Sequence, residues 1–347
     1  MKSIGAFTLI VLAAVATAAE AAPCLIVTLT GTQGGPSVFN GLAGAGTLVR
    51  YGDESDACSA VKVQFDTGRG TNMGLSQIPV TPQELNAVFF THMHADHTEG
   101  FPDVMMLRWY FKGPKIDIVC GSDAASPGGH TNSCRKFVAH VADAFLQSGD
   151  IDERRSEDNA RVAGGPAALA NTITFDPTDA PQVVWSSGAV KVSAIRSAHI
   201  AGHASFRVDT PAGSVVIGGD ASNDAPAPPR SHSTSDQVEE LAKGADLIVH
   251  STMHPVLGPD RGSGFPPQSF YRQSITSDLG AMAQRVGAKY LMLTHLAPSL
   301  GAARHNRWDV PGGALTEADY RKAVESGGFT GMTVVGKDLT SLRLPAN

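Results

Sequence analysis

The 347-residue sequence lacks an excess of positive charge, since it carries 27 Lys and Arg residues against 33 Asp and Glu residues. The net charge is −6 at pH 7, and the isoelectric point is near 6.0. Nucleic acid is ordinarily attracted by a basic surface, so this balance predicts no nucleic-acid partner. The charged stretch from Asp150 to Asp158 is expected to be a solvated loop.

Long apolar runs are also lacking beyond the N-terminus. Residues 1–22 contain an apolar run from Ile4 to Val15 and then small residues ahead of Pro23, which is typical of a cleavable secretory signal peptide. This run is well short of the roughly 20 residues that span a bilayer, and no later stretch is long enough. We therefore expect a soluble, periplasmic or secreted mature chain without a membrane span. A lipoprotein signal at Cys24 is the alternative, which the preceding proline fits poorly.

Cysteine is scarce, with four residues in the chain. An even number in an exported protein favours disulfide bonds, because the compartment outside the cytoplasm is oxidising. Four cysteines allow three pairings. We prefer Cys120 with Cys134, across the Gly-, Ser- and Pro-rich segment between them, and Cys24 with Cys58, which would tie the first strand to the next hairpin. Free buried thiols are the alternative.

A cluster of histidines with an aspartate is the most informative feature that is present. An apolar strand, Val88-Phe89-Phe90, runs into Thr91-His92-Met93-His94-Ala95-Asp96-His97. Side chains two residues apart on an extended chain share a face, so His92 and His94 can reach one metal ion. After the chain turns, Asp96 and His97 can reach a second. A single histidine is more often a hydrogen-bonded core or surface residue, but donors crowded this closely indicate a cation.

The pattern Thr-His-x-His-x-Asp-His resembles the ligand motif of the metallo-β-lactamase superfamily without a mismatch. The resemblance implies an α/β fold, the four-layer αββα sandwich, as one hydrolase domain over residues 23–347. Residues 148–185 are rich in Gly, Ala, Pro, Asp and Arg with little periodicity, so we expect an inserted lobe near 121–185. The lobe is either a lid over the site or an exposed loop. Apolar spacing predicts helices over residues 133–147 and 269–286.

The resemblance also implies ligands further along the chain. His199 stands shortly before Phe206-Arg207, Gly218-Gly219-Asp220 follows one strand, and Thr294-His295-Leu296 follows another. By family position the first ion would be held by His92, His94 and His199, and the second by Asp96, His97 and His295, with Asp220 bridging and with Asp96 and Asp220 as catalytic residues. Imidazole and carboxylate donors favour two zinc ions, with iron or manganese as alternatives.

Three further residues are predicted to support the ligands. Asp66, in Asp66-Thr67-Gly68 after the strand 61–65, looks like a residue that orients ligands, with a plain strand-to-loop turn as the alternative. His203 is either a pocket residue or a bystander. His250 stands where members of the superfamily have a histidine that is often followed by Glu. Ser251 follows here, so we expect His250 to support the site and not to act in catalysis.

Within the superfamily the chain looks most similar to the branch that joins ribonuclease Z with secreted arylsulfatase-like hydrolases. One departure concerns the proton donor, because ribonuclease Z has a catalytic His-Ser-Thr where this chain has Gln273-Ser274-Ile275. An ester whose leaving oxygen is not protonated leaves well only as a weak base. We therefore expect a hydrolase that uses a metal-bridging hydroxide on sulfate or phosphate esters, or related compounds, with activated leaving groups.

Other functions stay open on the sequence alone. The alternatives among enzymes are a β-lactamase or lactonase and a ribonuclease Z-like phosphodiesterase. Outside the enzymes, the alternative is a metal-binding protein without turnover. A small-molecule substrate is expected, and the sequence indicates neither its identity nor the oligomeric state.

Overall fold

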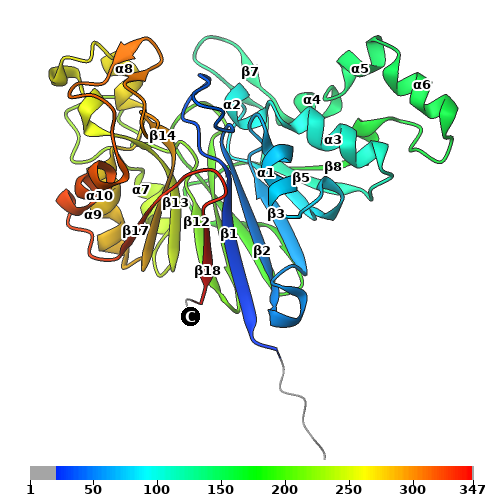
Figure 1. Cartoon of the computed structure of the whole chain (residues 1–347), viewed down its shortest axis with the longest axis horizontal. Coiled ribbons are helices and arrows are strands. Elements are labelled where there is room, and N and C mark those ends of the chain that lie inside the picture. The colour runs from blue at the N-terminus through cyan, green and yellow to red at the C-terminus, as the bar shows by residue number, and fades with distance from the viewer. Residues whose placement is uncertain (1–20, 346–347) are drawn as a thin grey trace, which may run out of the picture.

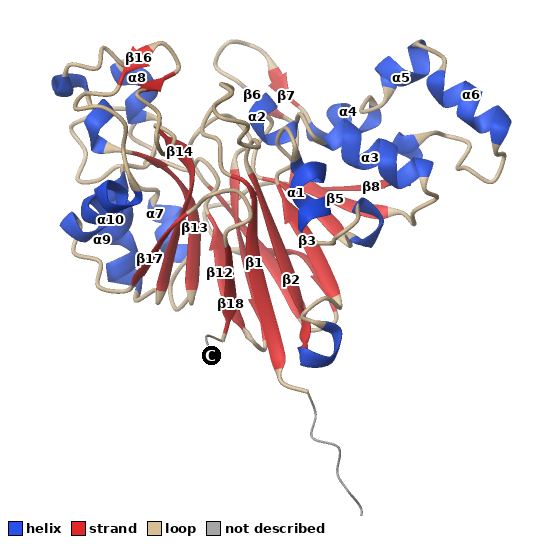
Figure 2. Cartoon of the chain, viewed as in Figure 1, coloured by secondary structure: helices blue, strands red, loops and turns tan. Residues whose placement is uncertain are grey.

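A computed structural model describes residues 21–345. Strands with apolar side chains form the centre of the molecule. They form two seven-stranded sheets that pack face to face, with helices outside both sheets (Figure 1 and Figure 2). Almost all of the predicted signal peptide lies outside the described residues, so export stays a prediction. No helix formed by residues 21–345 combines the length and the apolar character that a bilayer crossing requires.

Each large sheet combines antiparallel and parallel strands. The first has the order β18 (Ser341–Leu344), β1 (Pro23–Gly31), β2 (Gly46–Asp53), β3 (Val61–Phe65), β4 (Ala87–Phe90), β5 (Ile116–Gly121) and β8 (Ala170–Phe175). The second has the order β17 (Met332–Val335), β14 (Tyr290–Ala297), β13 (Leu247–Met253), β12 (Gly213–Ile217), β11 (Ala204–Thr210), β10 (Val190–Arg196) and β9 (Gln182–Ser187). Strands β3, β4, β5 and β8 are parallel, as are β12, β13, β14 and β17. Parallel strands place their carboxyl ends at one edge of a sheet, where side chains from several strands can meet.

Helices cover the outer face of each sheet (Figure 1). The first sheet is covered by α1 (Thr71–Gln77), α3 (Phe101–Tyr110) and α4 (Cys134–Ala139), and the second by α7 (Asp236–Leu241), α9 (Thr276–Val286) and α10 (Glu317–Ser326). The remaining helices are α2 (Ala95–Thr98), α5 (Asp143–Gln147), α6 (Asp150–Glu157) and α8 (Pro267–Tyr271), and short 3-10 turns lie at Glu54–Asp56, Pro82–Glu84, Pro166–Leu169, Pro255–Leu257 and Pro259–Arg261. Two small hairpins pair β6 (Ala124–Ala125) with β7 (Thr131–Asn132) and β15 (Arg304–His305) with β16 (Trp308–Asp309).

Phenylalanine rings hold the two sheets together. Phe65 of β3 and Phe89 of β4 stack with their ring centroids 4.8 Å apart. Phe206 of β11, in the opposite sheet, lies 5.6 Å and 5.5 Å from these two rings. All three side chains are buried, and burying one such side chain contributes about 1.5–3 kcal/mol. Because each sheet also buries its outer face against helices, the predicted four-layer αββα sandwich is confirmed.

The helix predicted over residues 269–286 is interrupted. It forms α8 and α9, separated by residues 272–275. The carbonyl of Ser274 accepts a hydrogen bond from the backbone N–H of Met253 (2.9 Å), and its hydroxyl donates to the carbonyl of Ala221 (2.7 Å). These tertiary hydrogen bonds take the place of helical ones, which the apolar spacing of the sequence does not reveal.

The segment between β5 and β8 leaves the sandwich and carries β6, β7 and helices α4 to α6 (Figure 1). The helix predicted over 133–147 is split into α4 and α5. The stretch from Asp150 to Asp158 is mostly helix α6, because acidic side chains in its first turn and arginines in its last turn complement the helix dipole. The lobe was predicted near 121–185, but its last part forms edge strands β8 and β9 of the two large sheets. The division into domains stays a prediction.

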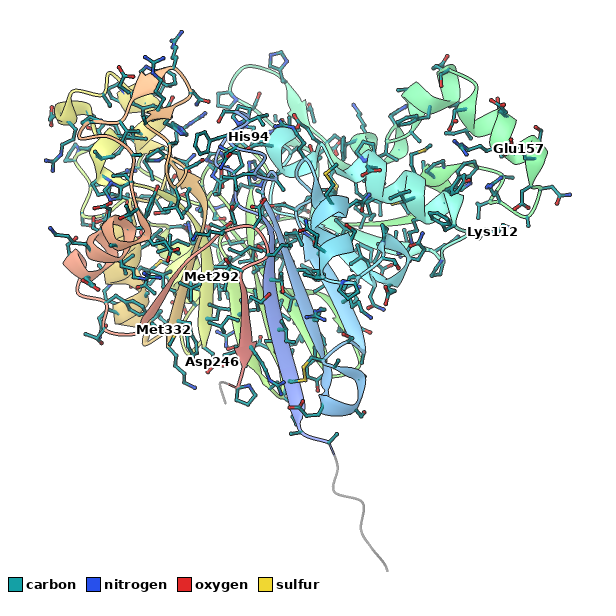
Figure 3. The ribbon with its side chains drawn as sticks, in the orientation of Figure 1. His94, Lys112, Glu157, Asp246, Met292 and Met332 are labelled. Atoms are coloured by element: carbon teal, nitrogen blue, oxygen red, sulfur yellow. A yellow bond between two sulfur atoms is a disulfide. The ribbon has the colours of Figure 1, made fainter. Side chains whose placement is uncertain are left out.

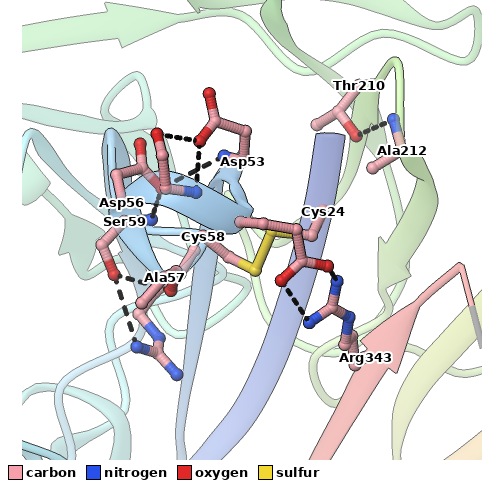
Figure 4. The surroundings of a disulfide bond; sticks show 12 residues. Cys24, Asp53, Asp56, Ala57, Cys58, Ser59, Thr210, Ala212 and Arg343 are labelled. Carbon is pink, nitrogen blue, oxygen red and sulfur yellow. Dashed lines mark hydrogen bonds and ion pairs between the residues drawn. A yellow bond between two sulfur atoms is a disulfide. The ribbon is translucent and has the colours of Figure 1, made fainter. Parts of the chain in front are cut away.

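Both preferred disulfide pairings are present. Cys24, at the start of β1, bonds to Cys58 (Figure 4). Cys120, in β5, bonds to Cys134, the first residue of α4. The second bond ties the lobe to the carboxyl edge of the first sheet. Each bond is expected to add about 2–4 kcal/mol to stability by restricting the unfolded chain.

A buried arginine of α3 joins the turn before β4 to the loop after α3. The side chain of Arg108 is 1% exposed, and its guanidinium donates to the carbonyl oxygens of Pro82, Leu85, Pro114 and Lys115. Burial lowers the pKa of Arg108 to about 10, so the group stays charged at neutral pH. Four backbone acceptors are therefore satisfied by one side chain.

Replacing this guanidinium should destabilise the fold. We expect Arg108→Met to lower the free energy of unfolding by about 3 kcal/mol or more, because several buried carbonyl oxygens lose their donor at about 1–3 kcal/mol each. Urea unfolding followed by circular dichroism measures this loss. The control is Arg321→Met on α10, where the exposed arginine pairs with partly exposed Glu317 and a change within about 0.5 kcal/mol is expected. Equal losses in the two variants would contradict the assignment.

Candidate metal centre

The histidine-rich segment lies at the carboxyl edge of the first sheet, where Figure 3 labels His94. The chain leaves β4 extended and turns into α2, and the hydroxyl of Thr98 donates to the carbonyl of His94 (3.0 Å). Gly68 packs so closely against this turn that a Cβ atom there would lie 2.4 Å from the carbonyl oxygen of Asp96. A glycine is therefore needed beside the turn that separates the first two histidines from the aspartate.

Three histidine nitrogens meet at the outer part of the site. Nε2 of His92 lies 2.9 Å from Nδ1 of His94, which lies 3.2 Å from Nε2 of His199. His199 comes from the loop after β10, in the second sheet. Its Nδ1 faces away from the group and donates to the carbonyl of Arg272 at 3.3 Å. The three inward nitrogens lie within 4.8 Å of one another, a spacing that one metal ion can bridge.

A second group joins Asp96, His97 and His295. Nε2 of His295 lies 3.1 Å from Oδ2 of Asp96, and Nε2 of His97 lies 3.7 Å from the same oxygen. Oδ2 of Asp220 lies 3.4 Å from His295, 3.6 Å from His97 and 3.7 Å from His199, so this carboxylate stands between the two groups. The structure thus brings all seven predicted ligands together, and their role as ligands stays a prediction.

Hydrogen bonds on the far side of two imidazoles set the direction of their lone pairs. Nδ1 of His97 donates to Oδ2 of Asp66 (2.8 Å), and the hydroxyl of Thr91 donates to the same oxygen (2.7 Å). Because the Thr91 hydroxyl uses its proton on Asp66, it accepts from Nδ1 of His92 (3.0 Å). In the neutral form of each ring, Nε2 therefore carries the free lone pair and faces the cluster. Asp66 lies where an orienting residue was predicted.

The donor set fits a metal ion better than it fits hydrogen bonding alone. Within the described chain, Nε2 of His97 and Oδ1 of Asp220 are buried without a hydrogen-bond partner. The contacting imidazole nitrogens of the outer group cannot all be satisfied by the single N–H that a neutral ring carries. One contact competes with a metal ion, since the backbone N–H of Gly35 points at Nε2 of His295 (3.0 Å). Imidazole and carboxylate donors in this proportion suit zinc.

Burial and charge set the protonation of these groups. Burial lowers the pKa of His92 well below its ordinary value, which keeps the ring neutral as a ligand must be. Burial opposes ionisation of Asp96, but the hydrogen bond with His295 and the charge of His97 outweigh it and lower its pKa to about 2. Burial also opposes charge on His97, but Asp220 and Asp66 raise its pKa well above the ordinary value. A proton on His97 is therefore what a metal ion would displace.

His203 and His250 lie beside the cluster and not in it. Nε2 of His203 accepts the backbone N–H of Asp220 (3.2 Å), and its Nδ1 lies 2.8 Å from the hydroxyl of Ser197. His203 therefore holds the backbone of the central carboxylate. The buried ring of His250 packs on Gly218, where an added Cβ atom would lie 2.1 Å from the ring. Both positions agree with supporting roles, which stay predictions.

Two contacts of the site had no role in the sequence analysis. Thr91 joins Asp66 to His92, and its place directly before the first histidine of the motif is a signal that could have indicated this. The backbone of Gly35, which contacts His295, belongs to a glycine-rich turn more than 250 residues away in sequence. Backbone contacts of this kind leave no signature in residue type.

A cavity of about 470 Å³ opens beside His199 and His203. It is lined by the lobe near β6, by the loop after β8 and by residues 196–203. The side-chain amide of Asn132, in the lobe, donates to the carbonyl of Ala201 (2.9 Å), so the lobe contacts the loop that carries His199. A substrate group can approach the cluster through this cavity.

Comparisons of the sequence with known proteins find relatives of this chain. A family model described as "Anti-Pycsar protein Apyc1" matches residues 57–127. Ribonuclease Z of Mycobacterium bovis (strain BCG / Pasteur 1173P2) is 26% identical over 324 residues, covering 91% of this chain and 96% of that protein. Ribonuclease Z of Mycobacterium marinum is 28% identical over 313 residues, covering 87% and 95%.

Solved structures show the same fold. The metallo-β-lactamase fold protein YhfI from Bacillus subtilis superposes with a TM-score of 0.58 at 16% identity, covering 92% of this chain and 99% of that one. Human tRNase Z, short form, superposes with a TM-score of 0.55 at 18% identity, covering 92% and 100%. The chain therefore has the metallo-β-lactamase fold over nearly its whole described length.

The comparisons correct one expectation. The acidic balance of the sequence predicted no nucleic-acid partner, but relatives that are ribonucleases match 91% of the chain. The prediction was wrong because a net charge of −6 averages over the whole surface, whereas a substrate meets only the charges near the site.

Removing the Asp66 carboxylate should loosen metal binding. We expect Asp66→Ala to lower metal affinity about 10–100-fold, because His97, and His92 through Thr91, lose the hydrogen bonds that orient them. Competition with a chromophoric chelator measures the affinity. Asp103→Ala, which removes an exposed carboxylate from the first turn of α3, is the matched control and should leave the affinity unchanged. An Asp66→Ala protein with the affinity of the control would contradict the orienting role.

Proposed function

We propose that this metal-dependent hydrolase of the metallo-β-lactamase fold is a phosphodiesterase of the ribonuclease Z kind that works with two zinc ions. The observation that carries the proposal is the match to ribonucleases Z over 91% of the chain at 26% identity. It favours the phosphodiesterase alternative over the arylsulfatase-like activity that was expected first, and over a β-lactamase or lactonase. The clustered donors supply the metal site that such a reaction requires.

The chain's own residues would hold and orient two ions. The proposed ligands are His92, His94 and His199 for one ion, Asp96, His97 and His295 for the other, and Asp220 for both. When bound, the ions would lower the pKa of a water molecule and stabilise the charge that grows on the phosphate in the transition state. Asp66 would keep the lone pair of His97 directed inward, and His203 would hold the backbone of Asp220 in place.

The place of the expected proton donor lies next to the site. Gln273 stands between Arg272, whose carbonyl accepts from His199, and Ser274, whose hydroxyl donates to the carbonyl of Ala221. Ala221 follows the central Asp220 directly. A glutamine amide does not transfer a proton to a leaving alkoxide as an imidazolium does. We infer that the enzyme favours phosphodiesters whose leaving group needs no protonation.

The proposed function is tested with purified protein and a panel of substrates. We expect about two zinc ions per chain and hydrolysis of bis(p-nitrophenyl) phosphate that a chelator abolishes and zinc restores. Asp96→Ala should lower kcat/KM at least about 100-fold, because a carboxylate that holds the metal is lost. Asp103→Ala, on the outer helix α3, should retain full activity.

Other members of the panel decide between the alternatives. Hydrolysis of p-nitrophenyl sulfate without hydrolysis of phosphodiesters would replace the proposal by an arylsulfatase-like activity. Preferential hydrolysis of nitrocefin or of a lactone would replace it by a β-lactamase or lactonase.

The missing proton donor gives a second prediction. In a series of aryl and alkyl phosphodiesters, the rate should fall steeply as the pKa of the leaving group rises. Gln273→His should raise the rates of alkyl esters, by up to about 100-fold, and flatten this dependence, since general acid catalysis typically contributes 100-fold or more. Gln273→Asn, which restores no proton donor, is the matched control. A flat dependence in the unmodified enzyme would show that another group protonates the leaving oxygen.

A further inference from the structure

The loop that carries His199 is anchored at both of its ends. It comprises residues 197–203, between β10 and β11. Near its start, the carbonyl of Ala198 accepts the backbone N–H of Ser222 (2.8 Å). Directly after the loop, the backbone N–H of Ala204 donates to the carbonyl of Thr91 (2.9 Å). The apex between these anchors is partly exposed, so its position depends on the segment that packs against it.

A hairpin of the lobe packs on this apex. We call residues 121–133, which contain β6 and β7, the closed hairpin. The side-chain amide of Asn132 donates to the carbonyl oxygen of Ala201 (2.9 Å). At the other end of the hairpin, a Cβ atom on Gly121 would lie 2.8 Å from the carbonyl oxygen of Gly202, so the two backbones approach closely. The closed hairpin therefore holds the apex from both of its own ends.

A disulfide bond closes the base of the hairpin. Cys120 in β5 bonds to Cys134, the first residue of α4, and both cysteines are buried. Across the same base, the hydroxyl of Ser133 donates to Oδ1 of Asp123 (2.6 Å). Strand β5 lies inside the first sheet, between β4 and β8. Joining the ends of a short segment restricts its conformations, so the hairpin has a fixed place on this sheet.

The metal centre depends on a connection of this kind because its ligands come from two sheets. His92 and His94 follow β4 of the first sheet, whereas His199 lies in the loop after β10 of the second. Nε2 of His199 stands 3.2 Å from Nδ1 of His94. The opposite nitrogen of His199 donates to the carbonyl of Arg272 at 3.3 Å, which orients the ring but not the backbone that carries it. The closed hairpin ties that backbone to the first sheet.

We propose that the closed hairpin positions His199 for the outer ion, the one that this residue would share with His92 and His94. Asn132 is the positioning residue, and the bond between Cys120 and Cys134 is its anchor. The inference rests on the proposed function, since it takes His199 as a ligand of one of two zinc ions. Disulfides persist in oxidising surroundings, so only the oxidised chain binds the outer ion with full affinity.

The test measures zinc affinity with purified, oxidised protein and a chromophoric chelator that resolves the two ions as two steps. We expect Asn132→Ala to weaken one ion about fivefold, because the loop loses one hydrogen bond. The double variant Cys120→Ser/Cys134→Ser should weaken the same ion about 10–100-fold, the usual effect of losing a partner that supports a ligand. The other ion should keep its affinity in both variants. Asn132→Ala retains both disulfides and decides the question if the double variant does not fold.

The second disulfide provides a matched control. Strand β1 runs in the same direction as β4, so Cys24 at its start lies at the edge of the sheet opposite the site (Figure 4). Cys24→Ser/Cys58→Ser should lose stability in urea unfolding but bind both ions with unchanged affinity. Asn171→Ala is the control for the single variant, because it removes an amide hydrogen bond to Asp117 (2.7 Å) at the amino ends of β8 and β5.

Activity adds a readout that separates positioning from general loosening. Because Asn132 acts through the metal, saturating zinc should restore kcat/KM of Asn132→Ala for bis(p-nitrophenyl) phosphate to within about twofold of the unmodified protein. Unchanged zinc affinity in Asn132→Ala would overturn the inference. Equal weakening of both ions, or the same loss in the Cys24→Ser/Cys58→Ser control, would also overturn it. Failure of the unmodified protein to bind zinc would instead refute the proposed function.

Discussion

The carboxylate of Asp66 is the interaction on which the arrangement of the metal centre depends. It is 5% exposed and accepts three hydrogen bonds, from the backbone and hydroxyl of Thr91 and from Nδ1 of His97. A buried carboxylate with fewer donors would cost several kcal/mol, so its place is stable only while these donors stay where they are. The residue has a positive φ of 53° directly after the end of β3. One side chain thereby couples two strand ends to two histidines of the cluster.

Packing beneath the site explains why these strand ends are held so firmly. Phe65 directly precedes Asp66, and Phe89 lies two residues before Thr91. Their rings stack on each other and contact Phe206 of the second sheet. The cluster is built from segments at the edges of both sheets, so its geometry depends on how the sheets pack. The phenylalanine core therefore supports the chemistry as well as the stability of the molecule.

Features that depend on neighbouring residues could be predicted from the sequence alone. Features that depend on residues far apart in the sequence could not. His92 to His97 form one local motif, and the strands around them were placed correctly because their apolar runs are short and unambiguous. His199, Asp220 and His295 depended on resemblance to a family, since no local pattern brings two loops and the strand β14 of the second sheet to the first. The interruption of residues 269–286 was missed because the hydrogen bonds of Ser274 are tertiary. The edge strands β8 and β9 were missed because their partly exposed residues weaken the apolar pattern.

The prediction of no nucleic-acid partner was wrong because it used the net charge of the whole chain to describe a local site. Net charge is a sum over the whole chain, whereas a bound substrate meets only the charges near the site. Gln273, between α8 and α9, offers no proton to the leaving group. A site without a proton donor has to rely more on binding, because contacts with remote parts of a substrate can be used to orient the reacting phosphate.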